Sequence, residues 1–368
     1  MIKKGLNWAF AAVWLVNGLY CKLLDGVPRH RLIVARILGA EHAGLLTKAI
    51  GVGECLMALW ILIGIWPRLS AAAQIVLVVV MNAIEFVLAP DLLLFGRLNA
   101  VVALIYVCIV YWDTFFTDHP FGVEAFFEES IVVCLAAPAA ELARLIPPCL
   151  ALDIYDDQWG FVAVAMVQSK GLRPRGFPNF FGSDFFLIGY RIFVRYTTRD
   201  GKRLRGLYIL RSETDSWRMK VLGNLLTRYK YSLTDISREA EGAQVAVRSA
   251  GSRFEVVVRE GAAGGQVSRA EDGLVPVPAD SPFSNWKEAR RFAGPMPFTF
   301  SYDAAKKRVT IVEGVRENWV PQPVEVIRCK IGGLVWGLDL GKMVVASAFR
   351  VRGVPYRWKK GKVEIWNG

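Results

Sequence analysis

Four long apolar segments lie within the first 115 residues, and they constrain the fold of this chain more than any other feature. They cover residues 6–21, 49–66, 69–89 and 98–115. A helix of about 20 apolar residues crosses the hydrocarbon core of a bilayer, and Trp and Tyr near several segment ends are typical of membrane interfaces. No small-residue cleavage site follows Tyr20-Cys21-Lys22, so we expect the first segment to be retained. We therefore predict an all-α bundle of four transmembrane helices.

The rest of the chain has a different charge. Lys and Arg number nine against seven Asp and Glu up to Pro120, which leaves 36 against 26 afterwards, so most of the net charge of +12 lies in the later part. This predicts a transmembrane domain at 1–117 and a basic, water-soluble domain at 118–368. Because the chain carries its own membrane domain and no nucleic-acid-binding motif, we expect its basic surface to meet the lipid bilayer rather than nucleic acid.

Several kinds of chemistry are excluded by residue type. The six cysteines are scattered without a C-x-x-C pair, which predicts neither a zinc site nor a disulfide framework. The three histidines end at His119, so the later part has no imidazole for a Ser-His-Asp or Cys-His mechanism. No metal, nucleotide, flavin, haem or iron–sulfur motif is present, and redox chemistry would therefore need an external electron carrier.

Polar side chains interrupt the predicted spans and mark a candidate membrane-embedded site. Each of them costs free energy in lipid and therefore usually faces a bundle interior, a partner or a ligand. Asn82 and Glu85 lie three positions apart and share a helix face. The alternative is that they form interhelical hydrogen bonds that only hold the bundle together. The candidate site consists of Asn17, Glu54, Asn82, Glu85 and Asn99.

After residue 130 the hydrophobic pattern changes to that of strands. Short strands are expected at 131–135 and 161–167, with a brief helix at 138–145 that Pro147-Pro148 ends. Asp200-Gly201 predicts a hairpin turn. The expected hairpins join 185–196 to 204–211, 244–248 to 254–258, and 298–302 to 309–313. Many antiparallel strands with few helices indicate a mainly-β, closed or nearly closed barrel.

The membrane part resembles a known family. The runs VWLVNG at 13–18, IGVGE at 50–54, MNAIEF at 81–86 and LLLFGRLN at 92–99 are similar in order and spacing to the DoxX-like family of four-helix membrane proteins. That resemblance implies a link to quinone redox chemistry, because some relatives are quinone-linked oxidoreductase subunits. It makes quinone the candidate cofactor. We expect a multi-pass protein of the bacterial inner membrane, with the soluble domain in the cytoplasm, where free cysteines persist.

The soluble part resembles a second family. AAELARLIP at 139–147, SPF at 281–283, PFTFSY at 297–302 and WVPQPV at 319–324 are similar to the YqjF-like uncharacterised family of the acetoacetate decarboxylase-like barrel superfamily. The decarboxylase acts through a lysine whose neutral amine forms a Schiff base. The resemblance makes Lys230 the candidate nucleophile, with Arg228 or Arg191 orienting a carboxylate. Leu187 stands where related proteins carry an acid, which argues against decarboxylation.

Other carboxylates and other functions stay open. Ser183-Asp184 and the pair Glu213 and Asp215 are alternative candidates for a functional carboxylate. The other interpretation is that they are solvated loop residues. Our reading is a membrane-anchored protein that binds or transforms a small apolar molecule at the bilayer, with a link to quinone chemistry. The alternatives are a lysine-dependent lyase or hydrolase that acts on a carbonyl acid, and a non-catalytic membrane scaffold. The sequence does not decide whether the barrel is an enzyme.

Overall fold

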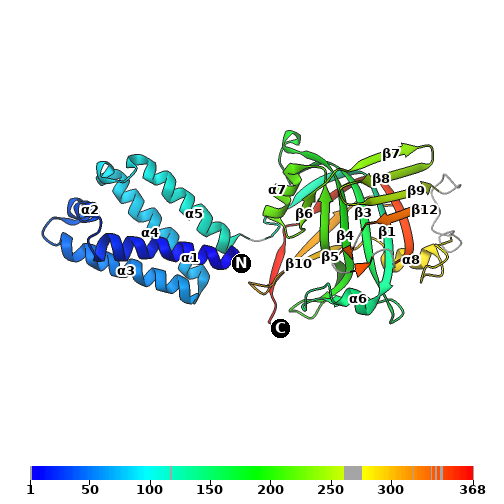
Figure 1. Ribbon diagram of the computed structural model, residues 1–368, viewed down its shortest axis with the longest axis horizontal. Coiled ribbons are helices and arrows are strands. Elements are labelled where there is room, and N and C mark those ends of the chain that lie inside the picture. The colour runs from blue at the N-terminus through cyan, green and yellow to red at the C-terminus, as the bar shows by residue number, and fades with distance from the viewer. Residues whose placement is uncertain are drawn as a thin grey trace. The chain divides into compact units, whose positions relative to one another are not determined.

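The chain forms two compact units in a computed structural model, Met1–Phe116 and Thr117–Gly368 (Figure 1). The first is helical and the second is mainly β, and the division falls one residue before the boundary expected from sequence. The described residues are 2–116, 118–260, 276–317, 319–332, 334–335, 338–339 and 343–367. The predicted fold class, a helical membrane bundle followed by a mainly-β barrel, is confirmed.

Helices cover all four apolar segments that were predicted as spans. Three helices in the described part are long and apolar enough to cross a membrane, at Ala43–Ile63, Pro67–Leu88 and Gly96–Phe115. The first predicted span is built differently, as an α-helix followed directly by a π-helix that together cover 22 residues. The elements are α1 Ile2–Leu15, η1 Val16–Leu23, α2 Arg29–Leu38, α3 Ala43–Ile63, α4 Pro67–Leu88, η2 Pro90–Leu92, η3 Gly96–Leu98 and α5 Asn99–Phe115.

Two glycines set the contact between η1 and α3. A Cβ added to Gly18 would come within 2.6 Å of the Gly51 carbonyl oxygen, and one added to Gly51 within 2.9 Å of the Gly18 oxygen. Small residues of this kind let membrane helices approach closely. The close approach brings the Lys22 ammonium to 2.8 and 2.7 Å from the two carboxylate oxygens of Glu54. A buried ion pair thus joins η1 to α3.

The β-rich unit confirms the predicted hairpins, with strands longer than expected. Strand β1 covers 16 residues where five were expected at 131–135, and β3 likewise extends beyond 161–167. The elements are β1 Val123–Pro138, α6 Ala139–Ala143, β2 Ala151–Leu152, β3 Trp159–Pro174, η4 Asn179–Phe181, β4 Ser183–Thr197, β5 Arg203–Thr214, α7 Trp217–Leu226, β6 Tyr231–Leu233, β7 Ser237–Glu241, β8 Gln244–Ser249, β9 Phe254–Glu260, α8 Trp286–Ala293, β10 Phe298–Asp303, β11 Arg308–Arg316, β12 Gln322–Ile331, β13 Leu334–Val335, β14 Leu338–Asp339, β15 Val344–Trp358 and β16 Lys362–Ile365.

Seven of these strands close into a barrel, in the order β1, β3, β4, β5, β10, β11, β15 and back to β1. The closing contact pairs Gly314–Arg316 of β11 with Tyr356–Trp358 of β15. Neighbours in the ring are antiparallel except β5 and β10, which are parallel. At its other end β15 also pairs with β12, from which β9, β8 and β7 extend the sheet (Figure 1).

Alternate residues of the barrel strands belong to two separate hydrophobic clusters. Ile131 and Val133 of β1 pack in the cluster that also holds Val256 of β9, under the extended part of the sheet. Val132 packs in the other cluster with Phe193. Because both faces of β1 are covered, residues 129–137 are all buried, and the alternation that would mark a half-exposed strand is absent.

Candidate functional site

The barrel encloses a cavity of about 420 Å³, large enough for a small organic molecule. Its walls come from the inner faces of the strands, including Val132 of β1, Phe193 of β4 and Phe349 of β15. Two of the lining positions on β3 are the small residues Ala163 and Ala165, whose short side chains leave space open. The lining is mainly apolar, so the cavity suits a molecule that is mainly apolar itself.

The charged side chains on the described lining are all arginines, with no Lys, Asp or Glu among them. Two are engaged by the protein: Arg173 forms an ion pair of 2.8 Å with Glu124, and Arg316 donates to the carbonyl oxygens of Pro295 and Met296 at 2.9 and 3.1 Å. Arg218 of α7 is exposed. Arg191 differs from these three, because its Nε is buried and forms no hydrogen bond with the described protein groups.

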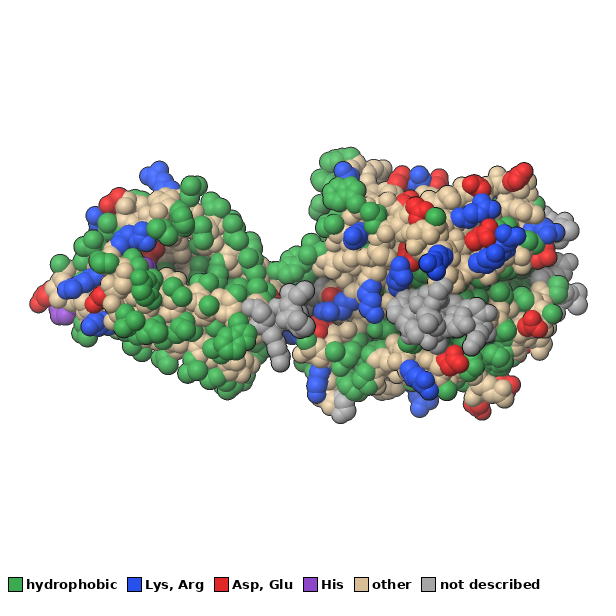
Figure 2. All heavy atoms as spheres, in the orientation of Figure 1, with side chains coloured by type: hydrophobic (Ala, Val, Ile, Leu, Met, Phe, Trp, Pro, Cys, Tyr) green, Lys and Arg blue, Asp and Glu red, His purple; other side chains and the backbone are tan. Residues whose placement is uncertain are grey.

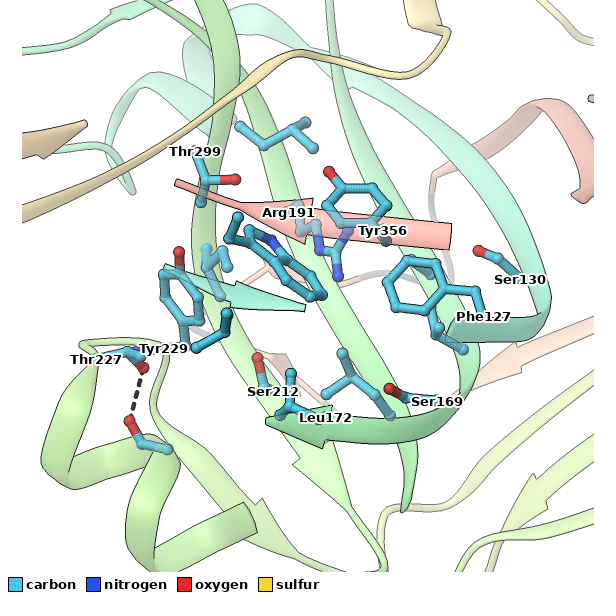
Figure 3. A pocket seen from close by; sticks show the side chains of 18 of the residues that line it. Phe127, Ser130, Ser169, Leu172, Arg191, Ser212, Thr227, Tyr229, Thr299 and Tyr356 are labelled. Atoms are coloured by element: carbon cyan, nitrogen blue, oxygen red, sulfur yellow. Dashed lines mark hydrogen bonds between the residues drawn. The ribbon is translucent and has the colours of Figure 1, made fainter. Parts of the chain in front are cut away.

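Local geometry on β4 directs Arg191 into the cavity. Leu187, Arg191 and Phe193 all line it, as residues two or four positions apart on one face of a strand do. Gly189 lies between Leu187 and Arg191 on this strand, and a Cβ at Gly189 would come within 3.1 Å of the Arg191 Nε. The missing side chain therefore leaves room for the guanidinium. Figure 3 shows Arg191 among the lining side chains, close to Tyr356 in the view.

Unsatisfied polar atoms are concentrated at this cavity. Ten buried side-chain nitrogen or oxygen atoms in the described part form no hydrogen bond with protein, and five of them belong to residues that line the cavity. Buried polar atoms are normally hydrogen-bonded, so unpartnered atoms on the cavity wall are available to a polar group of a ligand. The five are His119 Nε2, Ser169 Oγ, Arg191 Nε, the Tyr229 hydroxyl and Trp319 Nε1.

His119 gives the barrel a pH-dependent stability. Its ring lies 4.9 Å from that of Tyr229, and burial lowers the pKa of His119 from 6.5 to about 4. Between these values the unfolded chain binds a proton that the folded chain does not. The contribution of His119 to the free energy of unfolding is therefore constant above pH 6.5 and falls as the pH drops from 6.5 to 4, by at most about 1.4 kcal/mol per pH unit.

We expect His119→Gln to flatten this pH dependence, measured as the unfolding midpoint of the barrel in the full chain between pH 4.5 and 7.5. His42→Gln, which changes an exposed histidine of the helical unit, should leave the profile of the barrel unaltered. An unchanged slope in His119→Gln would show that other groups cause any loss at low pH.

The structure separates the three residues that the resemblance implicated in lysine chemistry. Arg191 lines the cavity, but Lys230 does not, and its side chain is exposed. Tyr229 and Tyr231 face the cavity, and the intervening Lys230, with a φ of 53°, points away from it. Arg228 forms ion pairs with Asp118 at 2.7 Å and Asp303 at 2.5 Å, and it also lies outside the lining. Lys230 and Arg228 are thus not positioned to act on a molecule in this cavity.

The alternative carboxylates have structural partners. Glu213 is buried, pairs with Arg211 at 2.6 Å, and has its pKa raised by burial. Asp215 accepts a hydrogen bond from the Phe186 backbone nitrogen at 2.8 Å, and Asp184 accepts one from that of Gly171 at 2.8 Å. None of these three carboxylates lines the cavity, whereas Ser183 does.

All five residues of the predicted membrane-embedded site line one cavity of about 330 Å³ in the helical unit. Asn99 donates a hydrogen bond to Asn82 at 3.1 Å, and Glu54 binds Lys22. Sequence reasoning missed Lys22 and Arg29, which also line this cavity. They stand beyond the end of the first apolar segment, where Lys and Arg are ordinary. The Arg29 Nε is buried and forms no hydrogen bond with the described protein groups.

Fold and sites together define a membrane protein in which a helical unit carries a closed β-barrel with a ligand-sized cavity. The chain belongs to the DUF2071 family of uncharacterised conserved proteins, whose model matches residues 127–343. A second family model, the DoxX-like family, matches residues 11–112. Both predicted resemblances are therefore confirmed. Among curated proteins, none matches the chain.

Solved structures similar to this chain include two of the acetoacetate decarboxylase type. One is an acetoacetate decarboxylase-like enzyme from Sphingomonas wittichii RW1, with 13% identity and a TM-score of 0.42, covering 67% of this chain and 94% of that one. The other is acetoacetate decarboxylase from Legionella pneumophila, with 12% identity and a TM-score of 0.44, covering 68% of this chain and 90% of that one.

Proposed function

We propose that the barrel binds a small, mainly apolar molecule that carries an anionic group such as a carboxylate. The observation that carries this proposal is the Arg191 guanidinium, whose Nε is buried without a hydrogen bond in an apolar cavity. The Arg191 side chain is partly buried, and a buried polar atom normally has a hydrogen-bond partner. Because no carboxylate is present on the described lining, the missing partner would come from the ligand, through charge-assisted hydrogen bonds.

Binding is better supported than Schiff-base chemistry. A lysine-dependent lyase or hydrolase needs an amine within reach of the carbonyl carbon, and no lysine is found on the described lining. The non-catalytic scaffold would need no cavity with unpaired polar atoms. We therefore propose a barrel that receives amphipathic acids close to a membrane, which for this chain we place at the bacterial inner membrane, on the cytoplasmic side.

A second candidate site lies in the helical unit. The convergence of Asn17, Glu54, Asn82, Glu85 and Asn99 on one cavity favours the binding of a small molecule with a polar end. We propose a quinone, because its carbonyl oxygens accept hydrogen bonds from donors such as the buried Arg29 Nε. Any electron transfer would then depend on a partner protein or carrier.

Native mass spectrometry of the detergent-purified full chain tests both proposals. We expect decanoic acid to bind at least about tenfold more tightly than decan-1-ol, because only the acid pairs with Arg191. Equal affinities for the acid and the alcohol would refute the anion site. A co-purifying quinone, or saturable binding of an added short-chain quinone, is expected for the helical cavity, and the absence of both would refute that assignment.

A further inference from the structure

The outer face of α7 exposes apolar side chains at the rim of the barrel cavity. Trp217 is 63% exposed, and Val221 and Leu225 are 52% and 50% exposed. The opposite face packs inward, where Gly223 is buried and lies so close to Tyr231 that a Cβ would come within 2.5 Å of its ring. α7 is therefore a firmly seated helix that turns an apolar face outward.

A loop after β3 adds a second exposed apolar group. Phe177, Phe180 and Phe181 are 50%, 79% and 52% exposed. Their rings pack against each other, with centroids 5.5 Å apart for Phe177 and Phe181 and 4.3 Å apart for Phe180 and Phe181. Three exposed, mutually packed phenylalanines are unusual on a surface that faces only water.

The two groups belong to one rim. The segment 119–122 links them, because the His119 nitrogen donates to the Leu226 oxygen of α7 at 2.8 Å and the Arg175 nitrogen donates to the Gly122 oxygen at 2.9 Å. Leu222 of α7 and Phe181 of the loop both line the cavity. Figure 2 shows hydrophobic side chains gathered over this part of the β unit, with Lys and Arg side chains among them. We call α7 together with residues 175–181 the cavity rim.

The charge of the cavity rim indicates its partner. Arg175, Arg218 and Lys220 are exposed among the apolar side chains, and α7 contains no acidic residue. Exposed Trp and Leu interleaved with Lys and Arg are typical of helices that lie in the interface of a bilayer with anionic lipids. A second copy of this chain fits less well, because a two-fold contact through α7 would bring like charges together.

Chain connectivity supplies a second argument. The last residue of α5, Phe115, ends a helix long enough to span a membrane, and the cavity-lining residue His119 follows only four positions later. The segment that joins the two parts of the rim is thus tethered to a membrane helix. A surface on such a tether meets lipid at high effective concentration, so weak contacts suffice for docking.

We propose that the cavity rim is a docking surface for an anionic lipid bilayer, through which the ligand of the barrel enters directly from the membrane. The docking itself does not depend on the identity of the ligand, whereas the entry route rests on the function proposed above for the cavity. The apolar side chains would insert at the level of the headgroups, with Arg175, Arg218 and Lys220 against lipid phosphates.

The test uses the full chain in nanodiscs that contain phosphatidylglycerol and a lipid with a photoreactive acyl chain. After illumination, peptide mass spectrometry should find lipid adducts on α7 and on residues 175–181, in addition to the membrane spans. The double variant Val221→Glu and Leu225→Glu should lower α7 labelling at least fivefold. Ile327→Glu, which changes an exposed apolar residue of β12, is the matched control and should alter nothing.

Wild-type labelling of α7 no higher than that of the peptide containing Ile327 would overturn the proposal, as would cross-links from α7 to a second copy of the chain. The double variant also separates docking from ligand binding, because neither Val221 nor Leu225 lines the cavity. It should bind decanoic acid normally in detergent but load it more slowly from vesicles. If the double variant takes up decanoic acid from vesicles at the wild-type rate, entry through the cavity rim is refuted, even if the barrel binds the acid.

Discussion

Replacing Arg191 with methionine is expected to weaken the binding of decanoic acid by roughly 10- to 150-fold, because hydrogen bonds to charged groups contribute about 1.5–3 kcal/mol. Methionine keeps an apolar stem of similar length but removes the guanidinium, so the shape of the cavity should change little. Binding of decan-1-ol should be nearly unchanged, since the alcohol does not need the charge. Titration of the detergent-purified full chain with each ligand measures both affinities.

A matched variant shows whether the effect belongs to the site. Arg144→Met removes an exposed arginine just after α6, outside the cavity lining, and should leave both affinities unaltered. An equal loss for the acid and the alcohol in Arg191→Met would indicate collapse of the cavity rather than loss of a charge. An unchanged affinity of Arg191→Met for decanoic acid would mean that another group holds the carboxylate.

The hairpins of the barrel could be predicted because their signals are local. Asp200-Gly201 supplies the left-handed turn that joins β4 to β5, with Gly201 at a φ of 79°. The length of β1 could not be predicted, since the buried Glu129 and Ser130 interrupt its apolar run. The structure explains Glu129 by its ion pairs with Arg350 and Arg238, partners more than 100 positions away. Long-range pairing of this kind leaves no local pattern in a sequence.

The difference between local signals and long-range contacts also decides which residues of the two candidate sites could be predicted. Polar residues in the spans were easy to find, because lipid makes each of them costly, and all five line one cavity. In the barrel, Arg191 came from a family resemblance, but the same resemblance also favoured Lys230. Which of them faces the cavity depends on strand register and on the backbone at Lys230, neither of which composition or spacing reveals.

The second large effect is expected from Glu54→Leu in the helical unit. The side chains of Lys22 and Glu54 are only 5% and 7% exposed, so removal of the carboxylate leaves an ammonium buried without its partner. Breaking a buried pair in this way costs about 3–5 kcal/mol. Cys21 and Cys55 flank the pair, and alkylation of these two cysteines at increasing temperature, read by peptide mass spectrometry, should report unfolding at a clearly lower temperature.

The double variant Lys22→Met and Glu54→Leu decides what the pair is for. If the pair only holds η1 against α3, apolar replacements of both partners should restore most of the lost stability, because neither charge remains to be desolvated. The quinone proposal predicts more than this: the double variant should fold and yet lose quinone, since Lys22 and Glu54 line the same cavity as Asn82 and Asn99. A stable double variant that retains the quinone would assign the pair to structure alone.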